Sequence, residues 1–290
     1  MRVRGGGARR RIRWPHVARY EEIMTTRKAQ LRRLVNGAGI DPGRFKRTVR
    51  GTRPYLDNRK RFLEQAAASG GEFAIADDYP CLTDRFDESG VANGQYFHQD
   101  LYVAQRIHAA QPRRHLDVGS RVDGFVAHVA AFRPIDVMDI RPLSTTARNI
   151  TFLQRDITRP DPSATASTDS LSCLHALEHV GLGRYGDDLD YYGYRKGWDN
   201  LVDLLQPGGR LYFSVPISDR QRIEFDAHRV FSVRYLCDEL FAPSGLRVED
   251  FAYVDDAGEL HAAVDVASPA AQASFGLTYG CGVFTLIKDA

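Results

Sequence analysis

Three acidic residues stand at or just after the ends of apolar runs, where they could bind a nucleoside. Asp117 lies in HLDVGSRVDGF (115–125) and is followed by Gly119, a turn in which a ligand can approach bare backbone. About twenty residues later IDVMD ends in Asp139, whose carboxylate can accept both hydroxyls of a ribose. Asp156 in FLQRDI follows the next run and could accept from the adenine amino group. Acids in this order predict a nucleoside site.

Two histidines follow later apolar runs and could serve an acceptor. His175 ends LSCLH, and His228 lies in EFDAHRVFS, so both are expected at the carboxyl edge of the sheet. A histidine can remove the proton of an alcohol, and we expect His228 or His175 to do so. The alternative for His228 is a buried histidine bonded to backbone. Tyr185 lies in a segment rich in Tyr, Gly and Asp (181–194), which suits a saccharide acceptor and an ordinary surface loop equally well.

A parallel sheet would bring these residues together. From His115 onward, short apolar runs alternate with helical patterns, which predicts an α/β fold with helices on both faces of the sheet. The stretch before the last run lacks a strong helix pattern, so the last strand is expected to return antiparallel. The fold expected is a Rossmann-like sheet of seven strands, mostly parallel. The predicted strands cover 115–118, 135–139, 150–153, 170–174, 210–215, 247–253 and 282–287.

The acids, together with LHALEHV and LLQPGGRLYFSVP, resemble the cofactor motifs of class I methyltransferases over residues 97–288. The resemblance implies the seven-stranded methyltransferase sheet and S-adenosylmethionine as cofactor. YFHQDL, LDVGSRVDGF, EHVGLGRYGD and EFDAHRVFS also resemble a bacterial family of methyltransferase-like proteins of unknown function, often associated with surface-polysaccharide genes. The cofactor residues implied are Asp117, Gly119, Ser120, Arg121 and Gly124 in the first turn, Asp139 and Ile140 at the ribose, Asp156 and Ile157 at the adenine, and Leu174 with His175 beneath the sulfonium.

The glycine loop departs from the D-x-G-x-G-x-G pattern of that family, because Arg121 stands where the second glycine is usual. Its side chain could crowd the cofactor, or its guanidinium could bind the methionine carboxylate or a phosphate. A non-catalytic binding or scaffold protein of the same fold is therefore an alternative. A second alternative is an NAD-dependent oxidoreductase, although the sequence lacks G-x-G-x-x-G.

The segment HALEH fits the zinc pattern H-x-x-E-H. It begins at a strand end, where His175 and His179 need not share a helix face. We therefore interpret Glu178 and His179 as packing and capping at a helix start. The acids of 187–190 lack the alternating pattern of a cation-binding loop, and the four cysteines form no C-x-x-C pair, so no metal is expected.

The charge of the chain is unevenly distributed. Residues 1–61 hold nineteen Lys or Arg against four Asp or Glu, although the net charge is only +2. We expect a basic, partly helical extension with a connector over 1–95, including a helix over 20–35, and a methyltransferase-like domain over 96–290. The extension could bind nucleic acid, which would suit a nucleic-acid methyltransferase, an anionic membrane surface or a phosphorylated substrate. A solvated helix face is preferred, because no aromatic-interleaved RNA motif accompanies the charge.

The first residues, the apolar stretches and the cysteines of the chain predict its cellular compartment. The first residues are charged without an apolar run, and the most apolar stretch, GFVAHVAAF, is short. Neither export nor a transmembrane segment is expected, and scattered cysteines favour the reducing cytoplasm. The expected partner is a small-molecule or saccharide acceptor.

Overall fold

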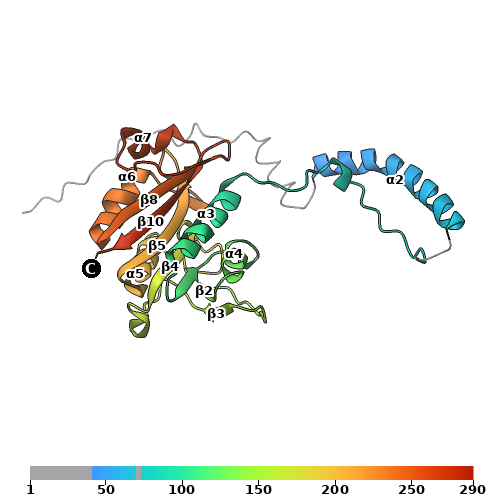
Figure 1. The fold of residues 1–290 in the computed structure, drawn as a ribbon. Coiled ribbons are helices and arrows are strands. Elements are labelled where there is room, and N and C mark those ends of the chain that lie inside the picture. The colour runs from blue at the N-terminus through green and yellow to red at the C-terminus, as the bar shows by residue number, and fades with distance from the viewer. Residues whose placement is uncertain (1–40, 70–72, 290) are drawn as a thin grey trace, which may run out of the picture. The chain divides into compact units, whose positions relative to one another are not determined.

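The structure, a computed structural model, describes residues 41–69 and 73–289 (Figure 1). The chain divides into two compact units, of which the first ends at Gly90 and the second begins at Val91. The helix expected over 20–35 lies outside the described residues. Helix α2 (Pro42–Ala68) lies in the predicted basic extension, and the Asp41 carboxylate caps it by accepting from the amides of Gly43 and Arg44.

A mostly parallel sheet forms the centre of the second unit and confirms the predicted fold class. The strands are β1 (His115–Val118), β2 (Ile135–Asp139), β3 (Ile150–Gln154), β4 (Thr168–Leu174), β5 (Leu205–Ile217), β8 (Leu246–Val254), β9 (Leu260–His261) and β10 (Gly280–Lys288). Their order is β3-β2-β1-β4-β5-β10-β8-β9. The pairs among β1 to β5 are parallel, whereas β10 runs antiparallel to both β5 and β8, as predicted for the last strand.

Helices cover both faces of this sheet (Figure 1). They are α3 (Gln95–Ala110), α4 (Ala127–Ala130), α5 (Gly193–Leu204), α6 (Val233–Tyr235) and α7 (Pro269–Gln272). Side chains alternate between the faces along a strand. In β5, Leu211 and Phe213 therefore join the core beneath α5, while Tyr212 joins the core beneath α3 and α4. Short or irregular helical turns cover Asp84–Phe86, Val122–Val126, Pro162–Ala164, Leu177–His179, Leu236–Phe241, Ala242–Ser244 and Ser274–Gly276.

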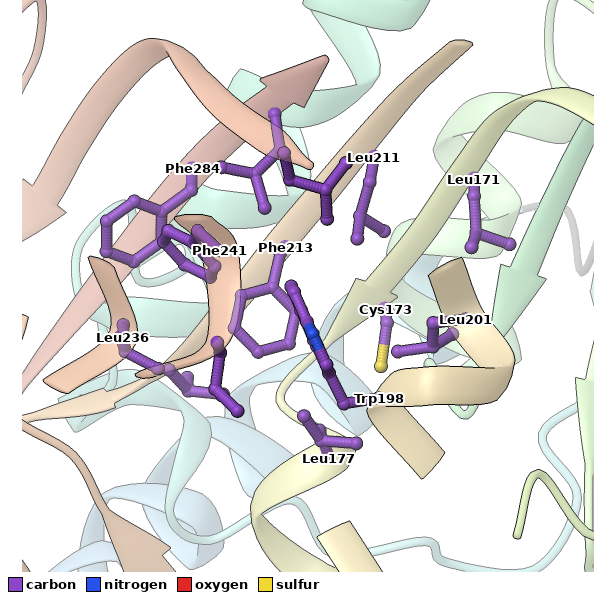
Figure 2. Packing of buried hydrophobic residues seen from close by; sticks show 14 of the residues in the cluster. Leu171, Cys173, Leu177, Trp198, Leu201, Leu211, Phe213, Leu236, Phe241 and Phe284 are labelled. Carbon is purple, nitrogen blue, oxygen red and sulfur yellow. The ribbon is translucent and has the colours of Figure 1, made fainter. Parts of the chain in front are cut away.

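The larger core cluster is built around Trp198 of α5 (Figure 2). The Trp198 ring lies 5.1 Å from the Phe213 ring and 5.4 Å from the Phe241 ring, measured between centroids. Its indole nitrogen donates to the Ser244 hydroxyl at 2.9 Å, so the one polar atom of the side chain is satisfied. This packing joins α5 to β5 and to the turn Leu236–Phe241.

The connections differ from the expectation that helices fill every gap. A loop without a helix joins β2 to β3 over 140–149, and only the turn Pro162–Ala164 lies between β3 and β4. The first of these segments, IRPLSTTARN, contains a proline and lacks the apolar spacing of a helix that packs on a sheet. The sheet has eight strands and not the seven expected, because the short edge strand β9 was not predicted. The hairpin of β6 (Arg222–Glu224) and β7 (His228–Val230) was not predicted either. Among the helices in the described parts of the chain, none is long and apolar enough to span a membrane.

Candidate functional site

A cavity of about 370 Å³ opens at the carboxyl ends of β1, β2 and β4. The strand order reverses between β1 and β4, which is where open α/β sheets bind ligands. Three predicted site residues, Asp117, Gly124 and His228, do not line the cavity. The predicted residues that line it are Gly119, Ser120, Arg121, Asp139, Ile140, Asp156, Ile157, Leu174, His175 and Tyr185.

The turn after β1 is shaped by Asp117 and opened by Gly119. The buried Asp117 carboxylate accepts from the Ser120 amide at 3.0 Å, the Ser120 hydroxyl at 2.8 Å and the Ser172 hydroxyl at 2.5 Å. Burial raises the pKa of Asp117 to about 6. Asp117 therefore stabilises the turn through hydrogen bonds without lining the cavity. Gly119, with a φ of 79°, lines the cavity.

We expect Gly119→Ala to destabilise the turn by about 1 to 3 kcal/mol. A Cβ atom at Gly119 would lie 2.7 Å from the Ala176 Cβ, and an alanine would also have to adopt a positive φ. Gly208→Ala is the matched control, because Gly208 has a φ of 74° but its Cβ would meet nothing within 4 Å. Urea denaturation of both variants measures the difference. Equal losses would show that backbone strain alone matters and that the contact with Ala176 does not.

Arg121 and Gly124 have roles different from those expected for a glycine loop. The Arg121 guanidinium donates to the Asp123 carboxylate at 2.7 and 3.0 Å, and both side chains are exposed. Gly124 makes room for Asp100 of α3, since a Cβ at Gly124 would lie 2.9 Å from the Asp100 carboxylate. Asp100 lines the cavity, and burial raises the pKa of its carboxyl group.

Asp139 ends β2 at the cavity and is paired with Arg141. The Asp139 carboxylate accepts from the Arg141 amide at 2.8 Å and from Nε of its guanidinium at 3.0 Å, with the guanidinium also contacting the second oxygen. The Arg141 guanidinium lies 4.4 Å from the centre of the Tyr185 ring, a cation–π contact. Arg141 thus contacts both Asp139, which is predicted to bind the ribose, and Tyr185, which is predicted to contact the acceptor.

Asp156 and Ile157 follow β3 and form another part of the wall. One oxygen of the Asp156 carboxylate accepts from the amide and hydroxyl of Thr158 at 2.8 and 2.7 Å. The Asn200 amide fixes the Ile157 backbone by donating to its carbonyl at 2.7 Å. The apolar part of the wall comes from Met138, Ile157, Leu174, Leu177 and Leu201.

His175 follows β4 in a strained backbone conformation, with a φ of 47°. Its Nδ1 lies 2.9 Å from the Glu178 carboxylate and its Nε2 lies 3.1 Å from the Cys281 sulfur. Burial lowers the pKa of His175, but its interactions with Cys281 and Glu178 outweigh burial and raise the pKa well above the ordinary value. Both ring nitrogens therefore face buried groups.

His228 begins β7 and lies away from the cavity wall. Its Nε2 is 3.4 Å from the Glu224 carboxylate, and its ring is 5.2 Å from the Tyr279 ring. Burial lowers the pKa of His228. The sequence analysis expected the two histidines on one rim, but the β6–β7 hairpin carries His228 behind His179, whose ring centroid is 6.4 Å away.

The capping interpretation of HALEH is wrong. The turn Leu177–His179 has no side-chain cap, and Glu178 is fully buried. His179 lines the cavity, and its Nδ1 donates to the Ala227 carbonyl at 2.6 Å. Among residues 41–69 and 73–289, no three His, Cys, Asp or Glu side chains gather as a metal site would require.

Several lining residues were missed by the sequence analysis. Gln99 and Asp100 are buried on the same face of α3 as Val103 and Ile107, and polar residues on an otherwise apolar helix face are a signal that could have identified them. The other missed polar or aromatic residues are Tyr96, Arg141, Arg155, His179, Arg184 and Asp187.

The comparisons with known proteins give a fold likeness at low identity. A family described as Caenorhabditis protein of unknown function, DUF268, matches residues 150–238, less than half of the chain. No curated protein matches the sequence. The function of that family is unknown, so the resemblance to polysaccharide-associated proteins stays a prediction.

Three solved structures illustrate the likeness. The 1,6-didemethyltoxoflavin-N1-methyltransferase of Burkholderia thailandensis, with bound 1,6-didemethyltoxoflavin and S-adenosylhomocysteine, is 18% identical with a TM-score of 0.46, covering 87% of this chain and 92% of that one. The N-methyltransferase NodS of Bradyrhizobium japonicum WM9, in complex with S-adenosylhomocysteine, is 15% identical with a TM-score of 0.43, covering 72% and 92%. The [4+2]-cyclase SpnF is 14% identical with a TM-score of 0.43, covering 61% and 74%. At this level of likeness, activity has to be argued from the site.

Proposed function

We propose that the protein is an S-adenosylmethionine-dependent methyltransferase that acts on a small or saccharide-type acceptor by O-methylation. One observation carries the proposal: Gly119, Asp139 and Ile157, which follow or end three successive strands, line one cavity beside the point where the strand order reverses. All the cavity residues lie within the domain proposed over 96–290. The basic extension proposed over 1–95 contributes none of them.

The residues of the cavity fit this cofactor. Gly119 leaves room for the methionine part, Asp139 would accept from the ribose hydroxyls, and Asp156 with Ile157 would hold the adenine. A cavity of about 370 Å³ with apolar walls and few polar groups is typical of small-molecule sites. When bound, S-adenosylmethionine supplies a methyl group whose carbon–sulfur bond breaks, with the electron pair going to sulfur, as an acceptor atom binds the carbon.

The acceptor side is formed by the segment after β4. Tyr185 lines the cavity, and the guanidinium groups of Arg141 and Arg184 lie 4.4 and 5.2 Å from its ring centre. Tyr191 and Tyr192 are exposed on the same segment, and aromatic faces beside polar groups suit a polyhydroxylated acceptor. Positioning donor and acceptor contributes roughly 7 to 11 kcal/mol at best.

A non-catalytic binding protein is the second candidate, and one observation favours it. The Arg141 guanidinium already occupies the Asp139 carboxylate that a ribose would need. A ligand must displace or share this guanidinium before its hydroxyls can bind. In a scaffold protein that binds no cofactor, the ion pair of Arg141 and Asp139 would stay intact.

Calorimetry with S-adenosylmethionine, S-adenosylhomocysteine and NAD tests the proposal. We expect the first two to bind the full-length protein at one equivalent and NAD to give no saturable heat. Saturable binding of NAD alone would favour the oxidoreductase. Absence of binding by all three would favour the non-catalytic protein.

A further inference from the structure

His179 lines the cavity, and its Nε2 has no hydrogen-bond partner among the described residues. Its Nδ1 lies 2.6 Å from the Ala227 carbonyl, which can only accept, so Nδ1 carries the hydrogen and Nε2 keeps its lone pair in the neutral ring. The ring lines the cavity and packs edge-on against Tyr185, with centroids 5.4 Å apart. The Arg184 guanidinium donates to the same carbonyl at 2.9 Å. Its Nη1 also lies 3.4 Å from His179 Nδ1, but the much shorter contact of Nδ1 with the carbonyl decides that Nδ1 carries the hydrogen.

The surroundings of His179 favour its neutral form. Burial lowers the pKa of His179, and the cations of Arg184 and His175 act in the same direction. The Glu178 carboxylate and the bond to Ala227 oppose them without reversing the shift. The His228 ring, 6.4 Å away, is the other titratable group that faces His179 from the β6–β7 hairpin.

Glu178 is a buried carboxylate beside two histidines. Its Oε1 lies 2.9 Å from His175 Nδ1 and 3.7 Å from His179 Nε2, whereas Oε2 has no hydrogen-bond partner among the described residues. A buried carboxylate with one oxygen unpaired costs folding free energy. It would, however, stabilise a positive charge that forms on His179 during a reaction.

The other two histidines are less suited to accept a proton. His175 has both ring nitrogens against buried groups, Glu178 and Cys281. His228 does not line the cavity. Of these three rings, His179 alone combines a place on the cavity wall with an uncommitted nitrogen.

On the basis of the proposed function, we infer that His179 Nε2 removes the proton of the acceptor hydroxyl and that Glu178 is the positioning residue behind it. As the acceptor oxygen binds the methyl carbon, its proton passes to Nε2 and His179 becomes an imidazolium. Glu178 Oε1 lies 3.7 Å from that same nitrogen and balances the new charge, while the Ala227 carbonyl holds Nδ1 on the other side of the ring.

The tautomer of His179 is the first test, and it needs no cofactor. Nitrogen-15 histidine spectra of the full-length protein, assigned by the signal lost in His179→Gln, should show a neutral ring at pH 7 with hydrogen on Nδ1. A ring protonated at pH 7, or one with hydrogen on Nε2, would overturn the inference. Failure of the proposed function is separate, because it would appear as missing cofactor binding in calorimetry.

The second test uses tritiated S-adenosylmethionine with a panel of monosaccharides and small phenols. His179→Gln should lower methyl transfer about 100- to 10,000-fold while cofactor affinity changes less than threefold. Glu178→Gln should lower the rate and move its pH profile, and it should also lower the melting temperature because it removes the buried partner of His175. A purely structural Glu178 would lower the melting temperature as well but leave the pH profile in place.

His228→Gln is the competing variant. A loss of rate in His228→Gln with full activity in His179→Gln would return the role to His228 and overturn the inference. If no panel compound is methylated, the tautomer measurement decides alone.

Discussion

Asp139→Ala is expected to weaken the binding of S-adenosylhomocysteine about 30- to 1,000-fold, or about 2 to 4 kcal/mol. Asp139 is the carboxylate at the end of β2 that lines the cavity, and two ribose hydroxyls would lose an ionised acceptor. Calorimetry on the folded variant measures the loss. Unchanged affinity would remove Asp139 from the site.

Two further variants separate the ribose contact from the ion pair. Asp136→Ala removes an acid from the same strand that is paired with Arg114 at 2.7 Å and does not line the cavity, so affinity should not change. Arg141→Gln frees the Asp139 carboxylate, so affinity should stay equal or rise if the guanidinium competes with the ribose. A loss of affinity in Arg141→Gln as large as in Asp139→Ala would mean that the closed pair itself binds the ligand.

Trp198→Ala should lower the free energy of unfolding by about 3 to 5 kcal/mol. Trp198 is 1% exposed, and its removal would leave a cavity beside Phe213 and Phe241 and an unpaired hydroxyl at Ser244. Urea denaturation followed by circular dichroism measures the change. Because α5 also carries Leu201, which lines the cavity, and Asn200, which holds the Ile157 carbonyl, cofactor affinity should fall as well.

Tyr191→Ala is the matched control for this loss of an aromatic side chain. Tyr191 lies just before α5 and is 67% exposed, so its replacement should change stability by no more than about 0.5 kcal/mol. A loss of less than about 1 kcal/mol in Trp198→Ala would show that the core repacks around the gap.

Periodicity and order along the chain were enough to predict seven of the eight strands of the sheet. Each predicted strand is present, and the antiparallel return of the last strand followed from the missing crossover helix before it. The same reasoning placed Asp139 and Gly119 on one edge, because parallel strands bring their carboxyl ends together. Apolar spacing and strand-end position are local properties, so they can be read without coordinates.

The connections and the electrostatics were decided by tertiary structure. His228 looked like a strand-end residue, but a hairpin directs it toward Glu224 and Tyr279. Glu178 looked like a capping residue, but the turn at Leu177–His179 buries it.

The sequence by itself therefore determined where seven strands lie along the chain and which strand ends could meet a nucleoside. Only the tertiary structure decided that Asp117 lies behind the turn, that Arg141 closes on Asp139, and that His179 reaches the cavity. The physical reason is that hydrogen-bond partners, burial and pKa depend on groups distant in sequence. The Ala227 carbonyl that orients His179 is 48 positions away along the chain.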